Sequence, residues 1–181
     1  LAAKTAVVTK GYVKSIIRLN VDPARVVYLN DVVTTESVKV LVAKLKKLDG
    51  SSKPIYLLIN SPGGEVLAGM NLISQLEGMQ SPVNTVCTGI CASMAAFIHQ
   101  YGVSRYSIDR SLLMFHPAST GGDAGQIPNV LSKLHTIQRS LDKMFAYIAT
   151  RSNQSLEQLQ SKIVYGDWVD AEDAKAEHLV D

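Results

Sequence analysis

Residues 54–64 read PIYLLINSPGG. The apolar run that ends at Ile59 is typical of a strand buried on both faces of a parallel sheet. The run stops abruptly at a turn built from Pro62, Gly63 and Gly64. In α/β folds, binding and catalytic sites gather where parallel strands end. This stretch therefore predicts a parallel sheet with a candidate site beside Gly63.

Outside this stretch, short apolar runs alternate with amphipathic segments. We expect further strands at residues 25–29, 83–87, 105–108 and 112–115. Helices are expected after a cap at Thr34 or Thr35, around residues 66–76, and at residues 92–100, the last beginning straight after Gly89. Repeated strand–helix–strand units predict an α/β fold with right-handed crossovers and a mostly parallel sheet.

A long helical stripe of apolar residues runs from Ile127 to Ile148. Its 22 residues correspond to roughly 33 Å at the usual helical rise. A helix of that length is expected to project from a small domain. Because its apolar residues share one side, a projecting helix needs a partner subunit to cover it.

The composition favours one globular domain. The chain has 181 residues, of which 46% are hydrophobic, and 18 basic residues stand against 16 acidic ones. No basic block is long enough to follow a phosphate backbone, so nucleic acid is not an expected partner. No apolar run approaches the roughly 20 residues that span a bilayer, and no secretory signal opens the chain. We therefore expect a soluble, cytoplasmic protein without a membrane partner.

Metal and cofactor sites are not expected. The two cysteines, Cys87 and Cys91, sit in an apolar stretch and are interpreted as buried reduced thiols. None of the four histidines lies at zinc-site spacing from this pair.

Ser93 is a candidate nucleophile because it follows a strand and is expected in the first turn of a helix. Unpaired N–H groups and the helix dipole favour a developing negative charge there. Taken alone, such a serine is more often a helix cap. The surroundings are not a Gly-x-Ser-x-Gly elbow, since Cys91 and Ala95 replace the glycines.

A serine nucleophile needs a base, and four histidines compete for that role. His99 lies six residues after Ser93, which turns it to another helix face. His135, in the long stripe, and His178, near the end, are expected to be structural or solvated. His116 ends the strand at residues 112–115, so it shares the carboxyl edge of the sheet with Ser93.

Gly63 and Gly64 supply a third element, because glycine allows close backbone approaches. Their N–H groups can donate to an oxyanion or pair with an extended peptide. A plain tight turn is the alternative reading of these two residues.

These motifs together resemble one known family. The matching segments, in order, are residues 59–64 (INSPGG), 68–70 (AGM), 87–89 (CTG), 92–96 (ASMAA), 114–116 (MFH), 121–126 (GGDAGQ), 154–158 (QSLEQ), 171–174 (AEDA) and 179–181 (LVD). Their order and spacing from about Val26 to Asp181 closely resemble the proteolytic subunit of the Clp protease, and the chain is similar to a divergent member of that family.

The resemblance implies a crotonase-like fold and a serine endopeptidase that acts on peptides and unfolded polypeptides. It implies stacked heptameric rings, a tetradecamer with an internal chamber, and a helix at about 127–151 that joins the rings. It also implies that Ser93 is the nucleophile, His116 the base, and the N–H groups of Gly63 and Met94 the oxyanion hole. Substrate is expected to lie along three further residues, namely Gly64, Glu65 and Pro117.

The chain departs from the family at the catalytic acid. Aligning the family's aromatic residue with Trp168 puts Gly166 where the aspartate is expected. Asp167 is adjacent and is predicted to be the acid if the turn shifts register. Losing an orienting carboxylate lowers turnover by about four orders of magnitude. In addition, Pro117 directly follows His116, where the family usually has a glutamine between them.

Two segments that mediate assembly in the family also differ. Tyr165 and Val164 occupy positions where the family has an arginine and an acidic residue in contacts between rings. Residues 1–25 form a divergent N-terminal segment, in which residues 12–19 read as a strand, ahead of a single peptidase domain at 26–181. Docking of an AAA+ unfoldase on this segment is therefore a hypothesis.

The sequence is compatible with three functions. The first is an active serine endopeptidase with Ser93, His116 and Asp167. The second is a non-catalytic ring subunit that regulates an active relative, which the glycine at 166 suggests. The third is an acyl-CoA enzyme on the same fold with Glu65 as its carboxylate.

Overall fold

Six strands form the main sheet of the computed structural model, which describes residues 4–9, 12–17, 19–117 and 127–181. These strands are β3 (Val26–Leu29), β4 (Ile55–Ser61), β5 (Val83–Ala92), β6 (Arg105–Ser107), β7 (Leu112–Met114) and β8 (Trp168–Asp170). Their order is β3-β4-β5-β7-β8, and β6 pairs with β5. All the pairings are parallel except that of β7 with β8, which is antiparallel.

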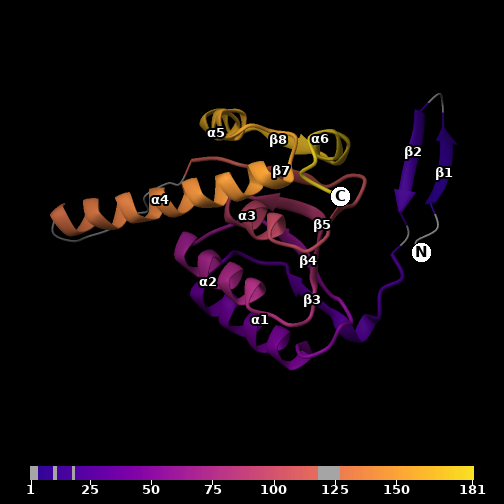
Figure 1. Cartoon of the computed structure of the whole chain (residues 1–181), viewed down its shortest axis with the longest axis horizontal. Coiled ribbons are helices and arrows are strands. Elements are labelled where there is room, and N and C mark those ends of the chain that lie inside the picture. Colours follow the sequence, from indigo (N-terminus) through magenta and orange to yellow (C-terminus); the bar gives the residue numbers. More distant parts are fainter. Residues whose placement is uncertain (1–3, 10–11, 18, 118–126) are drawn as a thin grey trace.

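The helices pack around this sheet. They are the 3-10 helix η1 (Pro23–Arg25) and the α-helices α1 (Thr35–Leu48), α2 (Val66–Glu77), α3 (Met94–Gln100), α4 (Ile127–Arg151), α5 (Leu156–Tyr165) and α6 (Ala171–Ala176). Helix α1 packs on α2, α2 packs on α3, and α3 packs on strand β5 (Figure 1). The prediction of an α/β, crotonase-like fold with a mostly parallel sheet is confirmed.

Local sequence explains these elements. Thr34 caps α1, and its side chain and that of Ser37 exchange hydrogen bonds with each other's backbone N–H groups. Leu57 and Ile59 of β4 are fully buried, whereas on the opposite face of the strand Leu58 is half-buried and Asn60 is exposed. The helices therefore cover one face of this part of the sheet, where the core lies, and the burial on both faces that the apolar run predicted is wrong.

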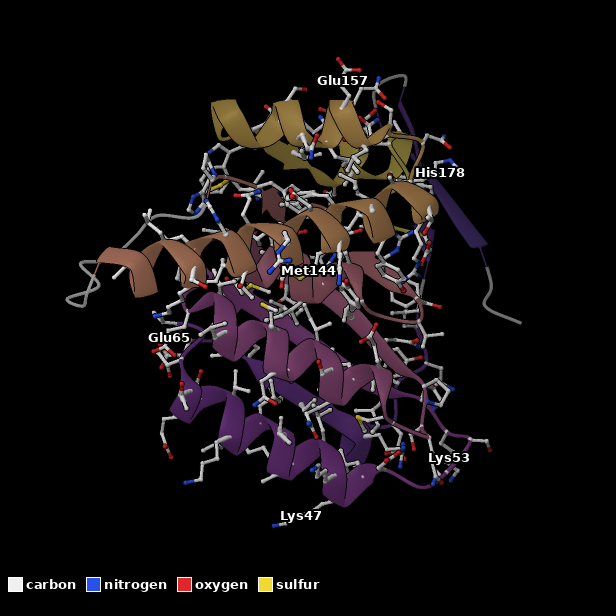
Figure 2. All side chains as sticks on the ribbon, turned by 60° about the vertical axis from the view of Figure 1, so that its left-hand side comes forward. Lys47, Lys53, Glu65, Met144, Glu157 and His178 are labelled. Carbon is white, nitrogen blue, oxygen red and sulfur yellow. The ribbon has the colours of Figure 1, made fainter. Side chains whose placement is uncertain are left out.

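The long helix α4 leaves the body of the molecule, as its apolar stripe predicted (Figure 1). Its second half is anchored, since Phe145 and Ile148 are buried, and Met144 lies where the helix crosses the body (Figure 2). Leu131, in its first half, is 51% exposed. No helix in the described ranges has the length and apolar character needed to cross a lipid bilayer.

One expected boundary was wrong. The helix predicted to begin straight after Gly89 begins instead at Met94, because β5 continues to Ala92. The β4–β5 register is irregular here, and the Ile90 N–H donates to the Asn60 side-chain oxygen at 3.0 Å. Strand β7 pairs with this extension and keeps it in the sheet. Ser93 is therefore the residue before the helix and not part of its first turn.

The N-terminal strands stand apart from the main sheet. Strands β1 (Lys4–Thr9) and β2 (Tyr12–Ile17) pair antiparallel with each other. The strand character predicted at 12–19 thus appears as β2, whereas the division into segments 1–25 and 26–181 stays a prediction. The glycine motif at 121–126 lies outside the described residues, as do the side chains of 163–165.

His99 is a buried residue in the last turn of α3. Its Nε2 donates to the Tyr106 carbonyl at 3.0 Å, and its Nδ1 accepts from the Gln100 amide at 3.2 Å. The pKa of His99 is lowered to about 4, chiefly by burial; the bond to Tyr106 opposes the shift, and the Arg105 cation nearby adds to it. The ring is therefore neutral in the folded protein near pH 7.

This shift predicts a loss of stability in acid. At pH values between 6.5, the ordinary histidine pKa, and about 4, the pKa in the folded protein, His99 is protonated in the unfolded chain but neutral in the folded one. The stability present above pH 6.5 is thus lost as the pH falls through this window, by about 3 kcal/mol.

Urea unfolding of the wild type and of His99→Gln at about pH 7.5 and about pH 4.5 measures this loss. The wild type should lose about 3 kcal/mol more than His99→Gln over the interval. Equal losses in the two proteins would contradict the account of His99.

Candidate active site

Ser93 has an unusual backbone conformation at the junction of β5 and α3. Its φ is 55° and its ψ is −127°, a region that non-glycine residues rarely adopt. The Ser93 N–H donates to the Met114 carbonyl of β7 at 2.8 Å, and its side chain makes no capping bond. Such a conformation costs about 1–3 kcal/mol and is typical of functional residues. The hydroxyl is half-buried at the carboxyl edge of the sheet.

Gly63 lies directly against Ser93. Its φ is +92°, and a Cβ added to it would lie 2.6 Å from both the Ala92 carbonyl oxygen and the Ser93 Cβ. The same atom would lie 2.9 Å from the Met94 nitrogen. Only glycine fits at this position, so the turn after β4 and the Ser93–Met94 peptide are in van der Waals contact.

Two backbone N–H groups, those of Gly63 and Met94, belong to this contact. The Met94 N–H has no acceptor among the described residues, and the Gly63 N–H makes a long bond of 3.2 Å to the Ser61 hydroxyl. The Met94 side chain is 2% exposed and packs against Gly69 of α2, which fixes the backbone at Met94. An anion beside Ser93 can therefore accept a hydrogen bond from the unpaired Met94 N–H, and a second from the Gly63 N–H, whose present bond to Ser61 is long.

Gly64 and Glu65 continue the turn toward α2. The Gly63 carbonyl accepts from Val33, and the Glu65 N–H donates to Val33, so Gly64 is bridged to Val33 in parallel fashion. The N–H and C=O of Gly64 itself point to the other side, because these groups alternate along an extended segment. An incoming extended peptide can pair with them.

The Glu65 carboxylate is already engaged. Its Oε2 accepts from the Thr35 N–H at 3.1 Å and from the Thr35 hydroxyl at 2.9 Å. It thus binds the first residue of α1, at the end of the molecule away from Lys47 and Lys53 (Figure 2). A catalytic carboxylate for acyl-CoA chemistry would have to give up both bonds.

His116 lies at the same edge as Ser93. Strands β5 and β7 pair in parallel with Ala92 opposite Met114, so both chains leave the sheet side by side. The imidazole is half-buried, and its Nδ1 is 2.6 Å from the Pro117 carbonyl oxygen. Within the described chain no hydrogen bond joins the Ser93 hydroxyl to His116, although such bonds are often long before substrate binds.

Asp167 lies on a different network. Its carboxylate is 3.4 Å from the Lys162 ammonium, which also binds Glu177 at 2.8 Å. Its N–H donates to the Lys162 carbonyl at 3.1 Å. Among the described residues it makes no hydrogen bond to His116, so the structure brings Ser93, His116, Gly63 and Met94 to one edge and leaves Asp167 with Lys162.

The register of β7 and β8 explains this arrangement. Met114 pairs with Trp168 in antiparallel fashion, and continuing that register places His116 opposite Gly166. Asp167 is one position further and would face the opposite side of the strand. Gly166 has a φ of +64°, and a Cβ built on it meets nothing within 4 Å. A side chain added at position 166 would therefore have space among the described atoms.

Other candidate chemistry is weaker. Cys87 and Cys91 are buried and free. Across the ranges that the structure describes, no three side chains of the metal-binding types cluster together.

Three groups that shape the site were not predicted from the sequence, namely Val33, Ser61 and the Met114 carbonyl. They act through tertiary contacts, which no sequence motif indicates.

Comparison with known proteins identifies the relatives of this chain. A family model described as Clp protease matches residues 10–181. The ATP-dependent Clp protease proteolytic subunit 3 of Synechococcus sp. (strain CC9902) is 34% identical over 168 residues, which cover 91% of this chain and 83% of that protein. The protein of the same name from strain CC9605 is 33% identical with the same coverage.

The contact between Gly63 and Ser93 predicts a strong effect of Gly63→Ala. Gly50→Ala is a matched control, since Gly50 has the same φ of +92° but a Cβ there meets nothing within 4 Å. Gly50→Ala should lower the free energy of unfolding by about 1 kcal/mol, from backbone strain alone. Gly63→Ala should lower it by at least about 2 kcal/mol more, from the clash with Ala92 and Ser93. Equal losses in a denaturant titration would contradict the contact.

The conformation of Ser93 predicts that glycine stabilises the protein relative to alanine. Ser93→Ala and Ser93→Gly both remove the hydroxyl, but only glycine adopts a φ of 55° without strain. Ser93→Gly should therefore be more stable than Ser93→Ala by about 1 kcal/mol. Thermal unfolding of the two variants measures the difference, and a more stable Ser93→Ala would show that the backbone is unstrained.

Proposed function

The chain belongs to the Clp protease family, and on that basis we propose that it is a serine endopeptidase that hydrolyses peptides and unfolded polypeptides. The observation that carries the proposal is the strained Ser93, held by Met114 and Gly63 beside the open Met94 N–H. A residue kept in a costly conformation at a strand end favours a role in chemistry over a role in packing.

In the proposed reaction His116 removes the hydroxyl proton of Ser93 as the oxygen attacks the substrate carbonyl. The carbonyl oxygen becomes an anion and receives hydrogen bonds from the N–H groups of Met94 and Gly63. The Gly63 N–H exchanges its 3.2 Å bond to Ser61 for this stronger acceptor. His116 then protonates the leaving amine, and a water activated by the same ring hydrolyses the acyl-enzyme.

The proposed substrate path runs along the turn after β4 and along the segment after β7. Gly64 offers unpaired backbone groups to an extended peptide, and Glu65 and Pro117 flank that path. Main-chain pairing of this kind recognises any extended chain, because it contacts atoms common to all residues. Unfolded polypeptides are therefore the proposed substrate class.

The proposed assembly is the family's pair of stacked heptameric rings. The exposed first half of α4, with Leu131 at its surface, is suited to a contact between subunits. Since Tyr165 and Val164 replace the family's charged residues, that contact is proposed to depend on α4. Both relatives are named as ATP-dependent, and we extend to this chain the hypothesis that an AAA+ unfoldase delivers its substrates.

A non-catalytic ring subunit is the second candidate function. The bond between Asp167 and Lys162, together with the missing side chain at Gly166, favours it. Retention of Ser93 in a strained conformation speaks against it, because an inactive subunit gains nothing from that strain.

Labelling with a serine-directed fluorophosphonate separates the two candidates. We expect the wild type to form a covalent adduct on the peptide that contains Ser93, with Ser93→Ala unlabelled. Ser132→Ala, on the exposed part of α4, is the matched control and should label fully. An intact wild-type oligomer that stays unlabelled would favour the non-catalytic subunit.

Cleavage of a fluorogenic peptide tests the two roles. Ser93→Ala and His116→Gln should each lower kcat by about four orders of magnitude or more. His178→Asn, an exposed histidine after α6, should leave kcat within about twofold. Hydrolysis that persists in Ser93→Ala would overturn the assignment.

A further inference from the structure

The imidazole of His116 has a partner that is not a carboxylate. Its Nδ1 lies 2.6 Å from the carbonyl oxygen of Pro117, the next residue. A carbonyl can only accept a hydrogen bond, so Nδ1 carries the proton in this contact. In the neutral ring the other nitrogen, Nε2, then holds the free electron pair that a general base needs. The contact thus selects the tautomer that a triad aspartate would otherwise select.

We propose that Pro117 is the positioning residue for the general base, and that its backbone carbonyl replaces the orienting carboxylate of a catalytic triad. The proposal rests on the function proposed above, since it assigns the partner of His116 in that reaction. It gives Pro117 a second role, beyond the flanking of the substrate path proposed above.

A proline is suited to this role for two reasons. Its ring fixes its own φ near −65°, which restricts where its carbonyl can point. It also confines the preceding residue, His116, to extended conformations. The ring nitrogen and its acceptor are therefore held on one short, stiff piece of backbone. A carboxylate on another strand is not required to bring them together.

The acidic groups nearby do not compete for Nδ1. Gly166, two residues before the Trp168 that pairs with Met114, has no side chain, and Asp167 is paired with Lys162. Lys162 in turn binds Glu177, so the three charges form one cluster. In the part of the chain that the structure describes, no carboxylate donates or accepts a hydrogen bond at His116.

A carbonyl orients the ring but lacks a full negative charge. It therefore stabilises the imidazolium that forms during catalysis less than an aspartate does. Adding an acid at position 166, two residues before the partner of Met114, should then raise turnover. Gly166→Asp is feasible because the site is open and aspartate tolerates a φ of +64° better than most residues.

The tautomer of His116 tests the proposal without reference to activity. Protein labelled with 15N-histidine is examined by NMR at about pH 9, where imidazole rings are neutral. His116→Gln identifies the signals of His116 by their loss. We expect a protonated Nδ1 and an unprotonated Nε2. A protonated Nε2 would overturn the proposal, whether or not the protein proves to be a peptidase.

Kinetics of Pro117→Ala test the positioning role. This variant keeps the carbonyl but releases the backbone, so kcat should fall about tenfold while KM stays within about twofold. Pro82→Ala is the matched control, because Pro82 directly precedes the first residue of β5, at the opposite end of that strand from Ser93. It should change neither kcat nor KM. Adding Gly166→Asp to Pro117→Ala should restore kcat to the wild-type value or above. A change in KM alone would mean that Pro117 binds substrate and would overturn the proposal.

Asp167→Asn separates the two candidate partners of the imidazole. If Pro117 positions His116, this variant should change kcat by less than about threefold, as expected for an exposed ion pair. A loss of about three orders of magnitude or more would assign the orienting role to Asp167 instead and overturn the proposal.

Discussion

The contact of Gly63 with the Ser93–Met94 peptide is the constraint on which the site depends. It requires a glycine after β4, a serine with a positive φ after β5, and a strand β5 that is long enough to pair with β7. The Ser93 N–H bond to Met114 fixes the third strand in the same contact. Three strand ends are thereby locked together, and strain of about 1–3 kcal/mol is carried by the residue with the hydroxyl. The surrounding core supplies the stability that makes this strain tolerable.

The same sheet geometry accounts for the divergent part of the site. Because side chains alternate along a strand, a one-residue difference in position decides which face a carboxylate reaches. The register of β7 and β8, continued past Trp168, would bring Gly166 toward His116, while Asp167 lies in a cluster with Lys162 and Glu177. The imidazole meets the Pro117 carbonyl instead. The proposed positioning role of Pro117 would supply the orientation of the base that a carboxylate would otherwise give.

Much of this architecture was readable in the sequence. Continuous apolar runs marked the parallel strands, helical spacing marked α1, α2 and α4, and strand-end placement singled out Ser93 and His116. The extension of β5 past Gly89 was missed because it depends on the Asn60 side chain of a neighbouring strand. The short β8 was missed because three residues carry too little periodicity. The partners of Asp167 and His116 depend on tertiary contacts, which no local pattern reveals.

The most direct test of the account is a crystal structure of the wild-type oligomer inactivated by a peptide boronate, which mimics the tetrahedral intermediate. The account predicts a covalent bond from the Ser93 oxygen to boron and a boronate oxygen within hydrogen-bond distance of the Met94 and Gly63 nitrogens. It also predicts that His116 Nδ1 remains on the Pro117 carbonyl. An inhibitor not bonded to Ser93, or bonded there with its oxygens turned away from both nitrogens, would contradict the account.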